Sequence, residues 1–207
     1  VVGKNIQNPY RWDSRAGTGL PLATVYGSGM AVNELGDVAG HVRIDGTTRP
    51  EAFRWTSGGG LQRLGLLTGA VQSTGYGIND AGAVVGYSTN AGSWNKAFIA
   101  TGAQVAEIVP PTGWRFTHAR DINNHGVVVG FGGAPHPING RGIVYNPATG
   151  DIRIPTVSNW YAYDNFEITN SGLVAGRADT LNFTASCAFL DDGVLHPTVN
   201  LGGAIAQ

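Results

Sequence analysis

The stretch Gly77–Gly86 reads GINDAGAVVG, and a closely similar ten-residue pattern occurs three more times along the chain without gaps. Its other copies are Ala31–Gly40, Asp121–Gly130 and Glu167–Gly176. One position, an Asn or Thr, recurs at spacings of 46, 44 and 46 residues: Asn33, Asn79, Asn123 and Thr169. Self-similarity at a constant period of this length is typical of repeat architectures.

A second, shorter motif follows each copy in the same phase. Its four occurrences, spaced 45, 45 and 46 residues apart, are Ala52–Trp55, Ala97–Ala100, Gly142–Tyr145 and Ala188–Asp191. Two motifs that keep phase over four copies indicate a structural repeat and not a chance similarity.

The first motif predicts a β-hairpin. An apolar strand ends at the Asn or Thr, a four-residue turn closes on a glycine that supplies positive φ, and a Val-rich strand follows. The turn glycines are Gly36, Gly82, Gly126 and Gly172. The second motif opens another hairpin, for example Lys96–Ala100 with Val105–Val109. Two hairpins per period of about 45 residues make a four-stranded unit, which matches the blade length of a β-propeller.

The two ends of the chain resemble complementary parts of one further unit. At the N-terminal end, Val1–Gly3 resembles Val84–Gly86, and Tyr10–Trp12 resembles Phe53–Trp55. Residues 1–25 are therefore expected to supply the second, third and fourth strands of a blade. The missing first strand is expected from the C-terminus, because Gly203–Gln207 resembles Tyr76–Asn79.

These observations predict an all-β, five-bladed β-propeller over residues 1–207 as a single domain, with about 41–46 residues per blade. The whole repeats lie near residues 26–70, 71–115, 116–161 and 162–200, and the closing blade is shared by residues 1–25 and 201–207. Such closure removes the exposed edges of an open sheet. The alternatives are an open array of four and a half units, or donation of the last strand between subunits.

The composition excludes several classes of protein. The chain has 207 residues with 32 Gly, 42% hydrophobic residues, 13% charged residues and a net charge of −1. It is too apolar for a disordered chain, its glycines lack the triplet period of collagen, and no basic block favours nucleic acid. No stretch approaches the roughly 20 apolar residues of a membrane-spanning helix. The single cysteine, Cys187, excludes an internal disulfide framework and a cysteine-based zinc site.

The composition also favours a secreted protein, because lysines are few and Asn, Thr, Ser and Gly are in surplus. The sequence begins at Val1, which fits a mature secreted form or a fragment and does not separate the two.

The repeat pattern Ala-x-[Ile/Val]-Asn-x-x-Gly-x-Val-x-Gly, followed by Ala-Phe-x-Trp, resembles the HAF-repeat family of extracellular bacterial repeat proteins. The His of the His-Ala-Phe triplet that names the family is replaced here by Glu51, Lys96, Arg141 and Cys187. The resemblance covers most of the chain and implies a β-propeller-like fold and secretion. It implies no particular chemistry, because the repeat residues are structural.

Aromatic residues break the repeat on one face. In such a propeller, the loops between blades share a face with those between second and third strands, and binding groups gather on such loops. Nine residues before the repeat Asn or Thr, two neighbouring copies carry Trp114 and Trp160, in loops rich in Pro, Gly and Asn that favour exposure. The predicted ligand-binding residues on this face are Trp94, Trp114, Arg115, Trp160, Tyr161, Tyr163 and His136.

Flat aromatic faces beside Arg, Asn and hydroxyl groups suit sugar rings, which offer C–H patches and fixed hydroxyls. The alternative is that the tryptophans plug the seams between blades. For His136, a rigid loop flanked by prolines is the alternative to a place in the site.

Ionisable side chains gather in the third and fourth copies, where the first two copies carry small or neutral residues. If the chain is an enzyme, the predicted acid–base residues are His118, Arg120, Asp121, Asp164 and Glu167. The alternative is a salt-bridged seam between blades, in which Arg120 neutralises Asp121 or Glu167.

Three functions therefore remain open: a lectin-like extracellular propeller that binds a glycan or small ligand, an enzyme (hydrolase, lyase or cyclase), or a structural protein that assembles by exchange of terminal strands. No metal ligand set or cofactor is predicted, although a five-fold channel could hold an ion or waters on strand carbonyls. No nucleic-acid partner or membrane span is expected, and the choice between monomer and homo-oligomer is open.

Overall fold

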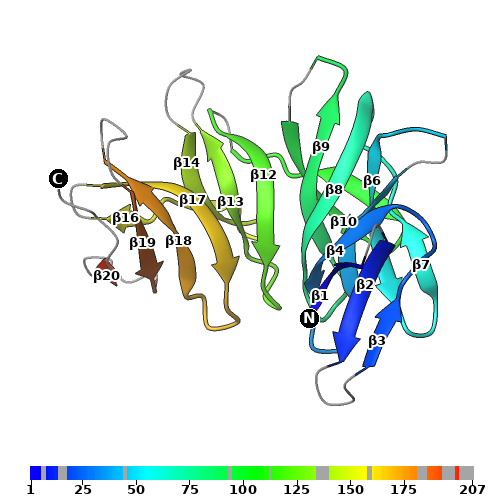
Figure 1. Ribbon diagram of the computed structural model, residues 1–207. Helices are drawn as coiled ribbons and strands as arrows, with labels where there is room; N and C mark the ends of the chain where they lie inside the picture. The colour runs from blue at the N-terminus through cyan, green and yellow to red at the C-terminus, as the bar shows by residue number, and fades with distance from the viewer. Residues whose placement is uncertain are drawn as a thin grey trace. The chain divides into compact units, whose positions relative to one another are not determined.

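The computed structural model describes residues 1–5, 8–13, 18–43, 46–92, 95–111, 113–133, 140–157, 160–180, 186–192 and 199–200. Within these ranges the chain forms strands and turns, and none of these residues lies in a helix that could cross a membrane. The strands form five antiparallel sheets (Figure 1). They belong to two compact units, Val1–Ile108 and Val109–Gln207, which we describe separately.

In the first unit, three sheets follow one another along the chain, and neighbouring strands within each sheet are consecutive. The first sheet holds β1 (Val2–Asn5), β2 (Asn8–Asp13) and β3 (Thr18–Pro21). The second holds β4 (Gly27–Val32), β5 (Val38–Arg43), β6 (Pro50–Thr56) and β7 (Gly60–Arg63). The third holds β8 (Ala70–Ile78), β9 (Val84–Asn90), β10 (Asn95–Thr101) and β11 (Gln104–Glu107).

The second unit holds two sheets. One is formed by β12 (Arg115–Ile122), β13 (Val128–Gly133), β14 (Gly140–Asn146) and β15 (Asp151–Arg153). The other is formed by β16 (Thr156–Val157), β17 (Trp160–Ile168), β18 (Val174–Asp179), β19 (Ser186–Asp191) and β20 (Val199–Asn200).

The same tight turn joins the first two strands of each of the four repeats. The glycine N–H donates to the carbonyl oxygen of the repeat Asn or Thr over 2.9 to 3.1 Å, in the pairs Gly36–Asn33, Gly82–Asn79, Gly126–Asn123 and Gly172–Thr169. These four glycines have φ between 76° and 88°, a conformation that other residues rarely adopt. The predicted hairpin turns are therefore confirmed.

The glycine that closes each second strand is required for a different reason. A Cβ on Gly40, Gly86, Gly130 or Gly176 would lie 1.9 to 2.4 Å from a carbonyl oxygen of the first strand, that of Ser28, Thr74, His118 or Asp164 respectively. A β-bulge in each first strand shifts the register beside this contact, for example between Ala119 and Asp121. Any side chain at these positions would force the two strands apart.

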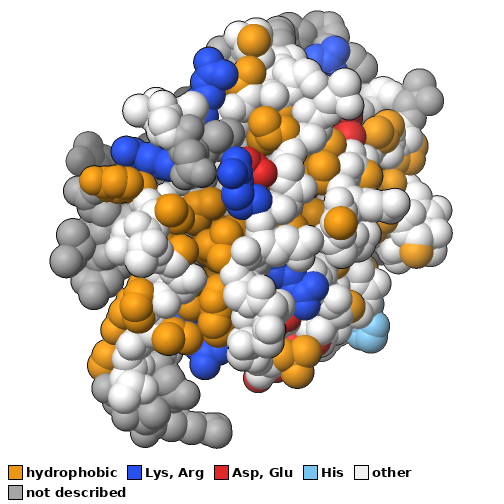
Figure 2. All heavy atoms as spheres, turned by 90° about the vertical axis from the view of Figure 1, so that its right-hand side faces the viewer, with side chains coloured by type: hydrophobic (Ala, Val, Ile, Leu, Met, Phe, Trp, Pro, Cys, Tyr) orange, Lys and Arg blue, Asp and Glu red, His pale blue; other side chains and the backbone are white. Residues whose placement is uncertain are grey.

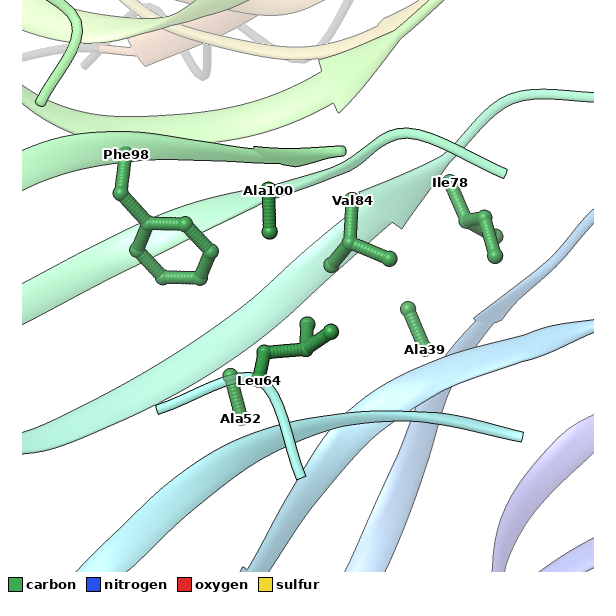
Figure 3. Packing of buried hydrophobic residues seen from close by; sticks show 7 residues of the cluster. All are labelled: Ala39, Ala52, Leu64, Ile78, Val84, Phe98 and Ala100. Carbon is green, nitrogen blue, oxygen red and sulfur yellow. The ribbon is translucent and has the colours of Figure 1, made fainter. Parts of the chain in front are cut away.

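In each later sheet of a unit, the first strand of the repeat packs against the preceding sheet. In the first unit β4 contacts β1 and β2, and β8 contacts β4, β5 and β6, while in the second β17 contacts β12, β13 and β14. Phe98, Val84 and Ala39 lie in the core shared by the second and third sheets (Figure 3). Full burial of a side chain such as Phe98 stabilises the fold by about 2 kcal/mol.

Both faces of the second sheet are buried. Val38 lies in a core with Phe53 and Trp55, whereas its neighbour Ala39 belongs to the core on the other face. This arrangement explains why apolar residues stand at successive positions instead of alternating with polar ones. Figure 2 shows one face of the molecule, where charged side chains are few, in keeping with the 13% charged composition.

The core of the second unit follows the same plan, with Val129, Val144, Ile168 and Val174 packed together. Cys187 lies in a small cluster with Ala178 and Phe189, where it acts as a small buried apolar group. Burial raises the pKa of its thiol, and the nearby Asp179 carboxylate raises it further.

The all-β prediction is confirmed, and so is the four-stranded repeat in the second, third and fourth sheets. The first sheet has three strands, as expected for residues 1–25. The predicted closing strand, residues 201–207, lies outside the described residues, so closure and the count of five blades remain predictions.

Candidate functional site

The predicted acid–base residues lie on the first strands of the two repeats in the second unit. His118, Arg120 and Asp121 belong to β12, and Asp164 and Glu167 belong to β17, which packs against it. The register shift between Ala119 and Asp121 places Arg120 at the bulge of its strand. Because every repeat has a bulge here, the bulge is part of the scaffold and does not by itself mark a site.

Arg120 forms an ion pair with Asp164 across the two sheets. Its Nη2 donates to Asp164 Oδ2 at 3.1 Å, and the Asp164 side chain is 10% exposed. The sequence predicted Asp121 or Glu167 as the carboxylate that Arg120 neutralises, and the observed partner Asp164 is a third member of the same group. The contact itself is of the kind expected for a salt-bridged seam.

Asp121 also joins the two sheets. Its Oδ1 accepts the N–H of Ile122 at 2.8 Å, and its Oδ2 accepts the N–H of Ile168 at 2.9 Å. The pKa of Asp121 is raised to about 6: burial raises it most, the neighbouring Glu167 carboxyl also raises it, and these two hydrogen bonds act in the opposite direction. Asp121 is therefore a half-buried acid that titrates close to neutral pH.

His118 is half-buried beside these groups. Its Nδ1 lies 3.0 Å from Thr117 Oγ1, and its ring packs edge-on against Phe131 with centroids 6.2 Å apart. Burial and, to a smaller extent, the Arg120 guanidinium together lower the pKa of His118 to about 4. The imidazole is therefore neutral at pH 7 and does not carry the acidic proton of an imidazolium there.

These contacts favour a structural role for the ionisable group. Arg120 and Asp164 pair with each other, both oxygens of Asp121 hold main-chain N–H groups, and His118 is kept neutral. Within the part of the chain that the structure describes, no three His, Cys, Asp or Glu side chains are placed to hold a metal ion.

The aromatic group begins with Trp114, which is half-buried just before β12. The main-chain N–H of Trp114 donates to the carbonyl oxygen of Pro111 at 3.1 Å, and the intervening Gly113 has a φ of 94°. The next residue, Arg115, is exposed. The turn thus fixes the backbone of Trp114 at the beginning of a strand.

The prediction that Trp160, Tyr161 and Tyr163 lie in a loop is wrong. All three belong to β17, where Trp160 pairs with Val157 and Tyr161 with Asp179. Aromatic residues fit a pleated strand well, so the strand begins before the expected repeat boundary. Arg115 likewise belongs to β12, paired with Gly133. Trp94 and His136, also predicted for this site, lie outside the described residues.

Sequence reasoning missed a second role of the repeat asparagines. Asn33 Nδ2 donates to the carbonyl oxygen of Asn79 at 2.9 Å, and Asn123 Nδ2 donates to that of Thr169 at 3.1 Å. Both contacts run from one sheet to the next within a unit. The recurrence of Asn at a period near the blade length was the signal, since a residue needed only for a turn can be replaced by Asp or Ser.

Comparisons with known proteins bear on the fold alone. No family model matches the sequence, and no curated protein is significantly similar to it. Among solved structures, a Mycobacterium tuberculosis puromycin-hydrolyzing peptidase is 14% identical with a TM-score of 0.47, too low to support the fold, over 100% of this chain and 44% of that chain. TolB from Acinetobacter baumannii is similar with a TM-score of 0.56 and 16% identity, over 90% of this chain and 46% of that chain.

The chain thus spans less than half the length of the TolB that it resembles. TolB-like structures are propellers, and the five antiparallel sheets described above agree with them. The chain has a β-propeller-like, all-β fold.

Proposed function

We propose that this chain is an extracellular five-bladed β-propeller that binds a glycan through Trp114, Arg115 and the residues around them. The observation that carries the proposal is the placement of Trp114 and Trp160. One directly precedes β12 and the other begins β17, so their backbones stand at the same end of two packed neighbouring strands.

This end lies away from the tight turns of the repeat. The turns that close on Gly126 and Gly172 follow the opposite ends of β12 and β17. The tight turns therefore occupy one side of these sheets, and the aromatic positions occupy the other, where connections vary in length and composition. Loops of variable sequence on a rigid scaffold are where propellers and other repeat folds carry binding groups.

The chemistry of Trp114 and Arg115 suits a sugar. Trp114 is half-buried and its backbone is fixed by a turn, so its indole can serve as an apolar platform whose main chain loses little conformational entropy on binding. The exposed guanidinium of Arg115 supplies several N–H donors for ring hydroxyls beside that platform. Trp94, Trp160, Tyr161, Tyr163 and His136 complete the proposed set from the sequence. No cofactor is part of the proposal.

Acid–base chemistry at Asp121 is the second candidate. The observation that favours it is the pKa of about 6, near the value that suits a group that gives and takes protons at neutral pH. The two main-chain hydrogen bonds on its carboxylate favour the glycan proposal over this one, since they give each oxygen a structural role between the two strands.

A glycan array tests the proposal directly. We expect the full chain to bind at least one class of oligosaccharide, and we expect Trp114→Ala to reduce that signal at least tenfold while circular dichroism shows an unchanged strand content. Trp12→Ala, a change at an exposed tryptophan of β2, is the matched control and should leave binding intact. An array without a single bound glycan would contradict the proposal.

A further inference from the structure

Two exposed arginines of the first unit have no acidic partner among the described residues. Arg43 is the last residue of β5, and Arg49 stands directly before β6. An exposed guanidinium without a carboxylate offers its charge and its N–H donors to a ligand. By contrast, five other described arginines each form an ion pair with an Asp or Glu side chain: Arg54, Arg63, Arg120, Arg153 and Arg177.

The hairpin of β5 and β6 brings the backbones of the two arginines to the same end of one sheet. Arg43 pairs with Pro50 in the last step of the ladder, so Arg49 lies next to that step. The main-chain N–H of Arg49 donates to Thr47 Oγ1 at 3.2 Å within the connection. Two positive charges at one end of a hairpin favour the binding of an anion there.

The described carboxylate of the same strand is bonded elsewhere. Glu51 of β6 has a side chain that is 9% exposed. Its Oε2 accepts Arg63 Nε at 3.0 Å, and its Oε1 accepts the main-chain N–H of Gly65 at 3.0 Å. Asp45, in the connection between the two strands, lies outside the described residues. Within the described residues, the positive charge at this end of the hairpin therefore has no counterion.

The ring of Tyr26 restrains the side chain of Arg43. The guanidinium carbon lies 4.8 Å from the centroid of the ring, and the main-chain N–H of Arg43 donates to the carbonyl oxygen of Tyr26 at 2.8 Å. Tyr26 is itself 50% exposed. A guanidinium that is held by an aromatic ring loses less freedom on binding, and its planar set of donors fits both oxygens of a carboxylate.

Tyr26 and Arg43 break the repeat. In the third sheet their positions are occupied by Gln72 and Thr89, which pair with each other. The first two strands of a repeat therefore pair without a stacked arginine at this end. Side chains that the scaffold does not need, at the end of a sheet where loops begin, are candidates for binding.

We propose that Tyr26, Arg43 and Arg49 form a second binding site, which takes the carboxylate or sulfate groups of an acidic polysaccharide. The exposed part of the Tyr26 side chain offers apolar contact to a sugar ring, and the two guanidiniums bind its anionic substituents. A nucleic acid fits less well, because the chain has a net charge of −1 and no basic block with which to neutralise many phosphates.

The site is separate from the proposed glycan site. It lies in the first unit, whereas Trp114 and Arg115 belong to the second. Binding of polyanions can therefore fail while the glycan array still gives a signal that depends on Trp114, and the reverse, so the two proposals fail separately.

Titration calorimetry of the full chain at low salt tests the site, with polygalacturonate and dextran sulfate as probes and uncharged dextran as the control. We expect at least one of the two polyanions to bind and uncharged dextran not to bind. Binding of polygalacturonate alone assigns the site to carboxylates, and binding of dextran sulfate alone assigns it to sulfates. Absence of binding to both would overturn the proposal.

Variants show whether the binding depends on this site. Arg43→Gln should raise the Kd about tenfold, and Arg43→Lys should raise it about threefold, because lysine keeps the charge and loses the planar donor set. Lys96→Gln is the matched control. It removes the same charge from an exposed side chain of the same unit, one that pairs with Glu107, and should change the Kd less than about twofold.

Two results would contradict the proposal. Equal losses in Arg43→Gln and Lys96→Gln would mean that the polyanions respond to charge in general and not to this site. Tighter binding to a single-stranded DNA than to either polysaccharide would mean that the ligand is a nucleic acid. Melting curves of each variant verify that the fold is retained, as expected for exposed side chains.

Discussion

The side chain of Asn33 donates from Nδ2 to the main-chain carbonyl oxygen of Asn79 at 2.9 Å, joining equivalent turns of two successive sheets. The same residue caps its own turn, because its Oδ1 accepts the N–H of Asp37 at 2.8 Å. In the second unit Asn123 makes the corresponding bonds to Thr169 and to the N–H of Val127. One side chain thus fixes both a hairpin and the spacing between sheets.

We expect Asn123→Ala to destabilise the protein by about 2 kcal/mol. Asn123 is 4% exposed, and the change removes three hydrogen bonds of its side chain, one to the carbonyl oxygen of Thr169 and two from the main-chain N–H groups of His125 and Val127. Thr169→Ala is the control, because its exposed side chain caps only its own turn, and it should cost less than about 1 kcal/mol. Urea unfolding of both variants measures the difference, and equal losses would show that the bond between sheets contributes nothing.

The two kinds of repeat glycine should respond differently to substitution. Gly130→Ala puts a methyl group 2.0 Å from His118 O and should cost about 2 kcal/mol or more. Gly126 has a φ of 78° with open space around its Cβ, so Gly126→Asn should cost less than about 1 kcal/mol, because Asn tolerates this conformation. Thermal melts of the two variants test the difference. Similar losses would mean that the close approach at Gly130 costs no more than the positive φ at Gly126.

The ion pair between Arg120 and Asp164 should stabilise the seam between the two sheets of the second unit. Arg120→Met leaves a nearly buried carboxylate without its charged partner, so we expect a loss of about 3 kcal/mol in the free energy of unfolding. The double variant Arg120→Met with Asp164→Asn should recover at least half of that loss, because it removes the isolated charge. A double variant no more stable than Arg120→Met would contradict this account.

His118 and Asp121 should give opposite pH dependences. The pKa of His118 falls from 6.5 to about 4 on folding, so its contribution to stability is present above pH 6.5 and is lost as the pH falls towards 4. The pKa of Asp121 rises from 3.8 to about 6, so its contribution is present below pH 3.8 and is lost as the pH rises through 6.

Variants separate the two effects, although Arg120, Asp164 and Glu167 also face this region. Between pH 6.5 and 4, Asp121→Asn should lose more stability than the wild type, because only the His118 effect remains. His118→Gln should lose less than the wild type over the same range. Melting curves at half-unit steps of pH measure both trends, and parallel curves for all three proteins would show that neither group is shifted by folding.

Much of the fold could be predicted from the sequence, because its determinants are local. A glycine follows the repeat Asn by three positions, as Gly36 follows Asn33 and Gly82 follows Asn79. This constant spacing predicts a hairpin turn, because the geometry of such a turn depends on a few adjacent residues. The reason for Gly130 could not be predicted, because the approach of His118 O depends on a bulge that leaves no mark in composition.

The site was harder to predict. The sequence groups Arg120 with three carboxylates, but the partner it meets depends on how β12 packs against β17, which no spacing along the chain determines. The predicted boundary between loop and strand near Trp160 was wrong for a related reason. Pairing with β16 and β18 extends β17 beyond the repeated motif from which its start was predicted.

Calorimetric titration with the oligosaccharide that binds best on the array tests the proposed function most directly. We expect the Kd of the wild-type chain to rise at least tenfold in Trp114→Ala, a loss of about 1.4 kcal/mol, and to stay unchanged in Trp12→Ala. Wild-type affinity in Trp114→Ala would contradict the proposed glycan site.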